Sequence, residues 1–122
     1  MANTTSFGRS TGGVTTGLTA GATQTQAGAT ALTGAQNTVT VVAADNDGVI
    51  LPAGHGQGSR VLVANLDAAQ DIKVYPNTGG TINGGSANAA LVVGQQQVAE
   101  FVQLGTDGLS WVAILGAVAT PA

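Results

Sequence analysis

The second part of the chain is built from short runs of β-branched and aliphatic residues. Residues 37–43 read NTVTVVA and residues 71–75 read DIKVY, so apolar and polar positions alternate in both runs. This period of two is typical of a strand with one buried face. The runs RVLVANL at 60–66 and WVAIL at 111–115 are instead apolar on both faces. No window shows the sustained period of 3.6 residues that indicates a helix, so the pattern predicts an all-β domain.

Turn residues separate these runs. DNDG at 45–48, PNTGG at 76–80 and TDG at 106–108 carry the Asn, Asp and Gly residues that tolerate tight turns. Further short apolar runs occur at 48–52, 90–93, 97–104 and 109–115. About seven or eight short strands separated by such turns predict a small antiparallel β-sandwich or a jelly-roll-like barrel. We expect this β domain to cover residues 36–118 and a short tail to follow at 119–122.

The β domain contains few large apolar side chains that could form its core. We expect this core to consist of aliphatic residues of the central runs and two aromatic residues: Val61, Val63, Ile72, Val74, Phe101 and Trp111. A strand that is apolar on both faces needs cover on both of them. One face can cover the domain's own core, and the other requires a second sheet, the N-terminal segment or another subunit. Residues 111–115 should therefore form a central or interface strand.

Residues 1–35 differ in character from the rest of the chain. They are rich in Gly, Thr, Ala, Ser, Gln and Asn, and their large apolar side chains are too few for a core of their own. Glycine and threonine also disfavour a stable isolated helix. We expect an extended arm that lies on a neighbouring subunit or a larger partner. Phe7, Val14 and Leu18 are its expected apolar anchors, and Arg9 is its expected charged contact.

Charge is the unusual quantity in the composition. Only 7% of the 122 residues are charged and the net charge is −3, whereas charged residues make up roughly 25% of an ordinary soluble domain. No cluster of Lys and Arg could neutralise nucleic-acid phosphates, so no nucleic-acid partner is expected. A monomer normally stays apart from its copies through surface charge. We therefore expect partners to cover much of the surface.

The sequence does not predict a disulfide-linked, secreted or membrane-spanning protein. The chain has no cysteine, which leaves no disulfide and no thiolate zinc site. Its start lacks a basic segment followed by an apolar run, so no signal peptide is expected. The most apolar stretch, at 111–119, is about half the roughly 20 residues that span a bilayer. We expect no membrane partner, and we expect synthesis in a cytoplasm.

Candidate chemistry is sparse. His55, the only histidine, lies in the Gly-rich segment 53–58 without the partners that acid–base catalysis or zinc requires. We interpret it as a loop or interface residue that could meet its own copies on a symmetry axis. DNDG resembles the start of a calcium loop but lacks the glutamate at the twelfth position, so a hairpin turn is preferred and calcium is the alternative. Glu100 could pair with Arg60 or Lys73 across the sheet. No catalytic group and no cofactor is expected, and the chain is not predicted to be an enzyme.

Four segments occur in an order that resembles a known family. They are GVILPA at 48–53, VLVAN at 61–65, VYPNTGGTING at 74–84 with SANAA at 86–90, and FV at 101–102 followed by Trp111. They resemble small β modules encoded among the structural genes of tailed bacteriophages. These modules include capsid decoration (cement) proteins and head-fibre or tail-fibre domains. VYPNTGGTING and SANAA are the most specific part of the resemblance.

The resemblance implies a virion structural protein. It implies a homotrimer that bridges capsomers of the major capsid protein on the outer surface of a phage head, assembled in the cytoplasm of the bacterial host. We place His55, Asn83 and Asn88 at the expected interface between subunits. The alternative is a head-fibre or tail module that binds a receptor or a glycan. Glycan binding usually uses exposed aromatic side chains, and the chain has only one Trp, one Tyr and two Phe.

Overall fold

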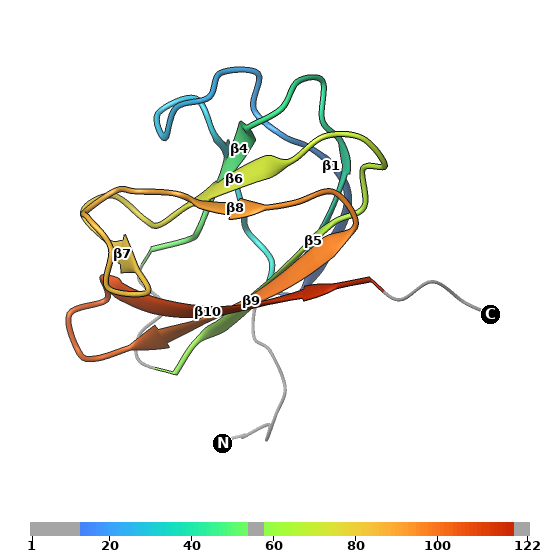
Figure 1. Ribbon diagram of the computed structural model, residues 1–122. Coiled ribbons are helices and arrows are strands. Elements are labelled where there is room, and N and C mark those ends of the chain that lie inside the picture. The colour runs from blue at the N-terminus through green and yellow to red at the C-terminus, as the bar shows by residue number, and fades with distance from the viewer. Residues whose placement is uncertain (1–12, 54–57, 119–122) are drawn as a thin grey trace.

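The chain forms two β-sheets that face each other (Figure 1). The computed structural model describes residues 13–53 and 58–118, and within these ranges it contains ten strands and no helix. The strands are β1 (Val14–Thr19), β2 (Thr30–Ala31), β3 (Gln36–Val41), β4 (Asp47–Ile50), β5 (Arg60–Asn65), β6 (Ile72–Tyr75), β7 (Thr81–Ile82), β8 (Leu91–Val93), β9 (Gln97–Leu104) and β10 (Ser110–Ala117). The all-β prediction is confirmed.

The first six strands alternate between the two sheets. Sheet A has the order β1-β3-β5-β9-β10-β7, and sheet B has the order β2-β4-β6-β8. Within each sheet the early strands pair in parallel, because the chain passes through the other sheet before it returns. Gln36 pairs with Val14 in the coil before it and with Leu62 in the coil after it. The N-terminal part therefore winds in stacked coils, in the manner of a β-solenoid.

The expectation of an antiparallel sandwich or barrel is wrong for this part of the chain. Among the described residues, five strand pairings are parallel and three are antiparallel. The DNDG segment is not a hairpin turn, since it leads from β3 in sheet A to β4 in sheet B. The TDG segment does join an antiparallel hairpin, β9 to β10. Gly105 and Gly108 in this loop have φ of 79° and 73°, a conformation that favours glycine.

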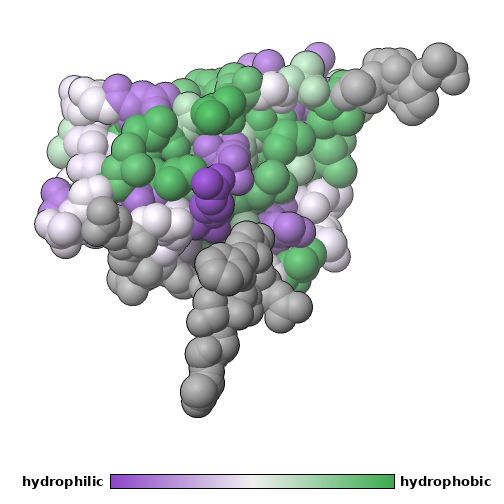
Figure 2. All heavy atoms as spheres, turned by 90° about the horizontal axis from the view of Figure 1, so that it is seen from below, coloured by the Kyte–Doolittle hydropathy of each residue, from purple (hydrophilic) through white to green (hydrophobic). Residues whose placement is uncertain are grey.

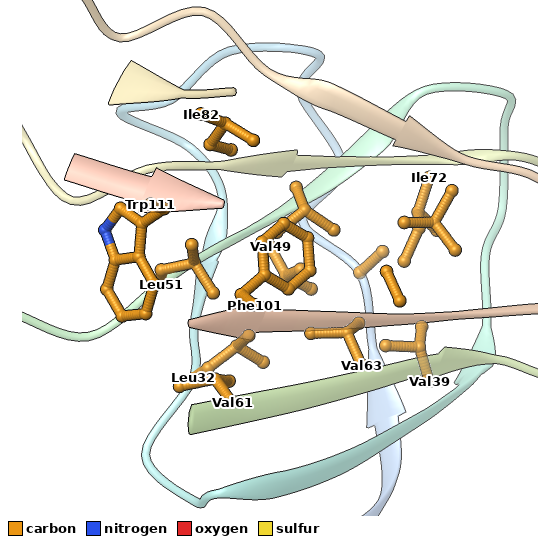
Figure 3. Close-up of a cluster of buried hydrophobic side chains, with 14 of the residues drawn as sticks. Leu32, Val39, Val49, Leu51, Val61, Val63, Ile72, Ile82, Phe101 and Trp111 are labelled. Atoms are coloured by element: carbon orange, nitrogen blue, oxygen red, sulfur yellow. The ribbon is translucent and has the colours of Figure 1, made fainter. Parts of the chain in front are cut away.

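The apolar core lies between the sheets (Figure 3). The six side chains expected in the core are all buried: Val61, Val63, Ile72, Val74, Phe101 and Trp111. Period-two alternation places them, since Val61 lies opposite Phe101 and Val63 lies opposite Ala99 in the β5–β9 pair. Phe101 and Trp111 come from the neighbouring strands β9 and β10. At roughly 25 cal/mol per Å² of apolar surface, burying these side chains is the main stabilising contribution to the fold.

Buried asparagines link the coils to one another. Asn37 on β3 donates through Nδ2 to the carbonyls of Gly34 and Leu62, at 3.0 and 3.1 Å. Asn65 on β5 donates to the carbonyl of Gln70 at 2.9 Å and to that of Val93 at 3.2 Å. These amides satisfy backbone carbonyls where the chain leaves one sheet for the other. Buried polar groups need such partners, so the two residues stabilise the turns of the coil.

Residues 13–35 were expected to form part of an extended arm outside the β domain. They belong instead to the sheets of their own chain: β1 pairs with β3, and β2 pairs with β4. Leu32 is buried in the core, and Leu18 packs against it. The described residues before the expected boundary at residue 35 therefore belong to the β domain. A Gly/Thr-rich segment can be ordered here because a parallel strand needs backbone hydrogen bonds and a few apolar contacts, not a core of its own.

Candidate functional site

The outer face of sheet A is the most unusual surface of the described residues. Strand register places the alternate side chains of β5, β9 and β10 on this face, away from Phe101 and Trp111. They are mostly aliphatic: Leu62, Val98, Val102, Val112 and Ile114. Ile114 is 69% exposed and Val112 is 41% exposed. Figure 2 shows this side of the molecule, with apolar atoms over much of its surface.

A single ion pair interrupts this apolar face. Arg60 Nη1 lies 3.2 Å from Glu100 Oε2, and both side chains are largely in contact with solvent. The two residues sit diagonally across the β5–β9 pair, since Arg60 is opposite Val102 and Glu100 is opposite Leu62. The pairing of Glu100 with Arg60 is thereby confirmed. Two opposite charges that neutralise each other leave the outer face of sheet A without net charge.

Part of the outer face of sheet B is covered by the chain itself. Tyr75 on β6 is only 7% exposed, and its hydroxyl donates to the carbonyl of Gln24 at 2.9 Å. Gln26 donates to the carbonyl of Pro76 at 2.9 Å. Burial raises the pKa of the Tyr75 hydroxyl. The loop at 22–29 therefore lies over sheet B, whereas the described residues offer no such cover for sheet A.

The VYPNTGGTING segment has structural roles in this molecule. Asn77 Oδ1 accepts from Trp111 Nε1 at 2.8 Å, and Asn77 Nδ2 donates to the carbonyl of Gly108 at 2.9 Å. A Cβ at Gly80 would lie 2.8 Å from the carbonyl oxygen of Leu109, so only glycine fits. The segment thus holds β7 against β10 and satisfies the buried indole of the core.

Two of the residues placed at the subunit interface are turn residues. Asn83 and Asn88 have φ of 54° and 67°, the left-handed region that asparagine tolerates better than most residues. Asn83 Oδ1 accepts from the backbone N–H of Ala113 at 2.8 Å, and Asn88 Oδ1 accepts from the N–H of Gly79 at 2.6 Å. Both are exposed. These roles explain their presence within one subunit, and contact with another subunit stays a prediction.

The structure describes two of the predicted arm anchors, Val14 and Leu18, and their environments differ. Val14 is 66% exposed on β1, and Leu18 is half-buried against the core. Leu18 therefore anchors the segment to its own subunit. Phe7, Arg9 and His55 lie outside the described residues.

The DNDG segment forms a turn stabilised by side-chain oxygens. Asp47 is buried, and its Oδ2 accepts from the backbone N–H of Ala44 at 3.2 Å while its Oδ1 accepts from Gln24 Nε2. Asp45 Oδ1 accepts from the N–H of Asp71 at 2.9 Å. These oxygens are used within the turn, and the described part of the chain holds no group of three His, Cys, Asp or Glu side chains that could bind a metal ion.

Asp67 caps the next loop between the sheets. Its Oδ1 accepts from the backbone N–H groups of Ala69 and Gln70, both at 2.9 Å. These hydrogen bonds to the carboxylate lower the pKa of Asp67. Asp67 therefore stabilises this turn through hydrogen bonds to its carboxylate.

Gly116 is a feature of β10 that the sequence analysis did not single out. A Cβ at this position would meet no atom within 4 Å, and its φ lies outside the region that favours glycine. The β9–β10 register is continuous at this point, so there is no bulge. The available signal was a glycine inside a strand, which often marks the close approach of another backbone or a ligand.

No protein-family model matches the sequence, and a search of curated proteins gives no significant match. Among the described residues, no helix is long and apolar enough to cross a membrane.

Proposed function

We propose that this protein is a virion structural protein of a tailed bacteriophage: a capsid decoration subunit that joins its own copies and lies on the major capsid protein. The observation that carries the proposal is the apolar outer face of sheet A, on which Val112 and Ile114 are exposed. Monomeric soluble proteins rarely leave a contiguous apolar face uncovered, and such faces usually mark sites of protein association. The sequence resemblance to phage decoration modules supplies the class of assembly.

Low charge supports association over catalysis or nucleic-acid binding. The chain carries six acidic and three basic residues, and Arg60 and Glu100 neutralise each other on the outer face of sheet A. A neutral apolar surface can be buried against a partner without the desolvation cost of unpaired charges. Such a surface suits a permanent contact in a particle. The homotrimer and the location on the outer capsid surface are proposals that rest on the resemblance.

A head-fibre or tail module that binds a receptor or glycan is the second candidate. It would use the same β domain but would need an exposed aromatic platform for sugars. Tyr75 and Trp111 are both buried, and each holds an internal hydrogen bond. Phe101 is buried as well. The burial of these three described aromatic residues favours the decoration subunit.

The number of copies in a particle tests the proposal. Purified particles of the phage that carries this protein should contain it in hundreds of copies, in a fixed ratio to the major capsid protein, as measured by quantitative gel densitometry. Electron microscopy should place it on the head. A handful of copies at the tail would replace the decoration role with the tail-module role. Absence from purified particles would overturn both.

A further inference from the structure

Sheet A has one irregular edge and one regular edge. At the irregular edge, the β1–β3 pairing shifts register twice, between Thr15 and Leu18 and again between Leu18 and Thr19. Bulges and twists of this kind prevent an edge strand from pairing with another chain. At the other edge, β10 pairs with β9 without interruption over eight residues, from Ser110 to Ala117. The β10 edge therefore lacks the protection that the β1 edge has.

Among the described residues, only the first part of the β10 edge has a partner. β7 pairs with Ser110 and Trp111, and the side chain of Asn83 then accepts from the N–H of Ala113 at 2.8 Å. The backbone N–H and C=O groups of successive residues point to opposite sides of a strand. Those of Trp111 and Ala113 point away from β9, and by the same alternation those of Leu115 and Ala117 do so too. Val118 fits this alternation, since its N–H donates to Gln96 next to β9 at 2.8 Å. No described strand pairs with Leu115 or Ala117 on the side away from β9.

Gly116 lies between these two residues. Nothing among the described residues requires a glycine there, because a Cβ would meet none of their atoms within 4 Å and the φ angle is not left-handed. Glycine in a strand interior weakens the strand unless another backbone must approach closely. Gly116 thus leaves the centre of the unpaired stretch of β10 free of side-chain atoms, and a second backbone can approach there.

We propose that β10 pairs with β10 of a second copy, antiparallel, around a two-fold axis at Gly116. Leu115 of each copy then lies opposite Ala117 of the other, and each such pair exchanges two backbone hydrogen bonds. This register leaves the bond between Asn83 and Ala113 in place. The two six-stranded sheets become one continuous sheet, and their apolar outer faces join across the axis.

The chemistry of β10 suits contact with itself. A two-fold axis brings each residue close to its own copy, so any charge near the axis would meet a like charge. The strand SWVAILGA contains no charged residue and no proline. Ile114, Leu115 and Val118 are 69%, 41% and 37% exposed, and they lie beside the proposed axis. Pairing would remove these side chains from water while it satisfies the edge backbone groups.

The contact is defined by β10 and does not depend on the role in a virion. A two-fold contact gives an even number of copies: two if it acts alone, or six if it joins two of the trimers that the resemblance implies. In a decoration layer it would link one assembly of subunits to the next.

A cysteine placed on the axis tests the proposal directly, because the chain has no other cysteine. In the proposed register, position 116 faces itself in a non-hydrogen-bonded pair, with Cα atoms about 4.5 Å apart, which is within the range that a disulfide can bridge. Gly116→Cys should form a disulfide-linked dimer when the purified full-length protein is oxidised with diamide at low concentration. Val14→Cys is the matched control: it is exposed on the opposite edge of the sheet and should stay monomeric on a non-reducing gel.

A second variant measures the contact without a cross-link. Gly116→Glu fits the isolated subunit, because a Cβ at this position meets no described atom within 4 Å, but it places two like charges directly opposite each other on the axis. It should lower self-association in sedimentation equilibrium by at least tenfold while leaving the circular dichroism spectrum and thermal midpoint of the subunit unchanged or raised.

The results separate this contact from the proposed function. Failure of Gly116→Cys to cross-link in preference to Val14→Cys, or unchanged association of Gly116→Glu, would overturn the β10 contact. The copy number in particles would still decide the virion role. A cross-linked dimer from a protein that is absent from particles would support the contact and reject the role.

Discussion

The outer faces of the two sheets differ in what covers them. Over sheet B, the loop at 22–29 buries Tyr75 and takes a hydrogen bond from its hydroxyl. Over sheet A, Val112 and Ile114 are exposed beside a neutral ion pair. Both faces carry apolar groups that favour burial. The loop buries Tyr75 on sheet B within the subunit, whereas the exposed side chains of sheet A are left for a partner. The Gly/Thr-rich N-terminal segment therefore buries apolar groups on sheet B, and a second subunit is proposed to bury those on sheet A.

The largest expected effect comes from the inner face, which both sheets share. Phe101→Ala removes a fully buried ring from the centre of the core and should lower the free energy of unfolding by about 3–5 kcal/mol. Val102→Ala, at the next position on β9 but pointing outward, should cost less than 1.5 kcal/mol. Denaturant unfolding of both variants measures the difference. Similar losses in the two variants would mean that the two faces of β9 are buried alike in solution.

The second prediction concerns the exposed face itself. Ile114→Ser on sheet A should weaken self-association, because full burial of an isoleucine side chain contributes about 1.5–3 kcal/mol, or a ten- to hundredfold change in the dissociation constant. Val92→Ser is the control, since Val92 is 44% exposed on β8 of sheet B. Light scattering over a concentration series should show a loss of association for the first variant alone. Equal effects would show that sheet A has no special role.

The third prediction tests the cover over sheet B. Tyr75→Phe removes the hydrogen bond to Gln24 and should lower the free energy of unfolding by about 0.5–1.5 kcal/mol at neutral pH. Burial raises the pKa of this hydroxyl, so the wild type should lose stability as pH rises from about 10, the ordinary tyrosine value, through the raised folded value. The sign follows because the folded state binds the proton more tightly than the unfolded state does.

Thermal unfolding at neutral pH and above pH 10 measures both effects. The wild type should lose more stability than Tyr75→Phe between the two conditions. An identical loss in the two proteins would show that Tyr75 ionises freely and that the loop at 22–29 does not cover it.

The smallest effect is expected at the ion pair on sheet A. An exposed pair contributes about 1 kcal/mol or less, so Arg60→Met should change subunit stability little. It should affect association more, because Glu100 would then enter an apolar contact without its partner. A double-mutant cycle with Glu100→Gln separates the pair from the single charges. Restored association in the double variant would support burial of the pair between subunits, and additive effects would place it outside the contact.

The sequence by itself determined the positions of most strands after residue 35 and the faces of their side chains. Alternation at 71–75 and 97–104 placed Ile72, Val74 and Phe101 inside, because a strand turns successive side chains to opposite faces whatever its partner is. The doubly apolar run at 111–115 predicted a central or interface strand. Its two faces carry a buried side chain, Trp111, and an exposed one, Ile114, and the interface stays a prediction. These results depend on local geometry alone.

Only the tertiary structure decided how the strands pair and where the N-terminal segment lies. Turn residues such as those at 45–48 show that the chain changes direction, but not whether it returns along the same sheet or crosses to the other. That choice depends on contacts between residues far apart, such as Asn37 with Leu62 and Tyr75 with Gln24. Residues 13–35 carry too few apolar groups to predict burial, yet parallel pairing with β3 and β4 orders them. The physical reason is that backbone hydrogen bonds between coils form with almost any side chain. The amino-acid composition of the segment therefore does not predict these bonds.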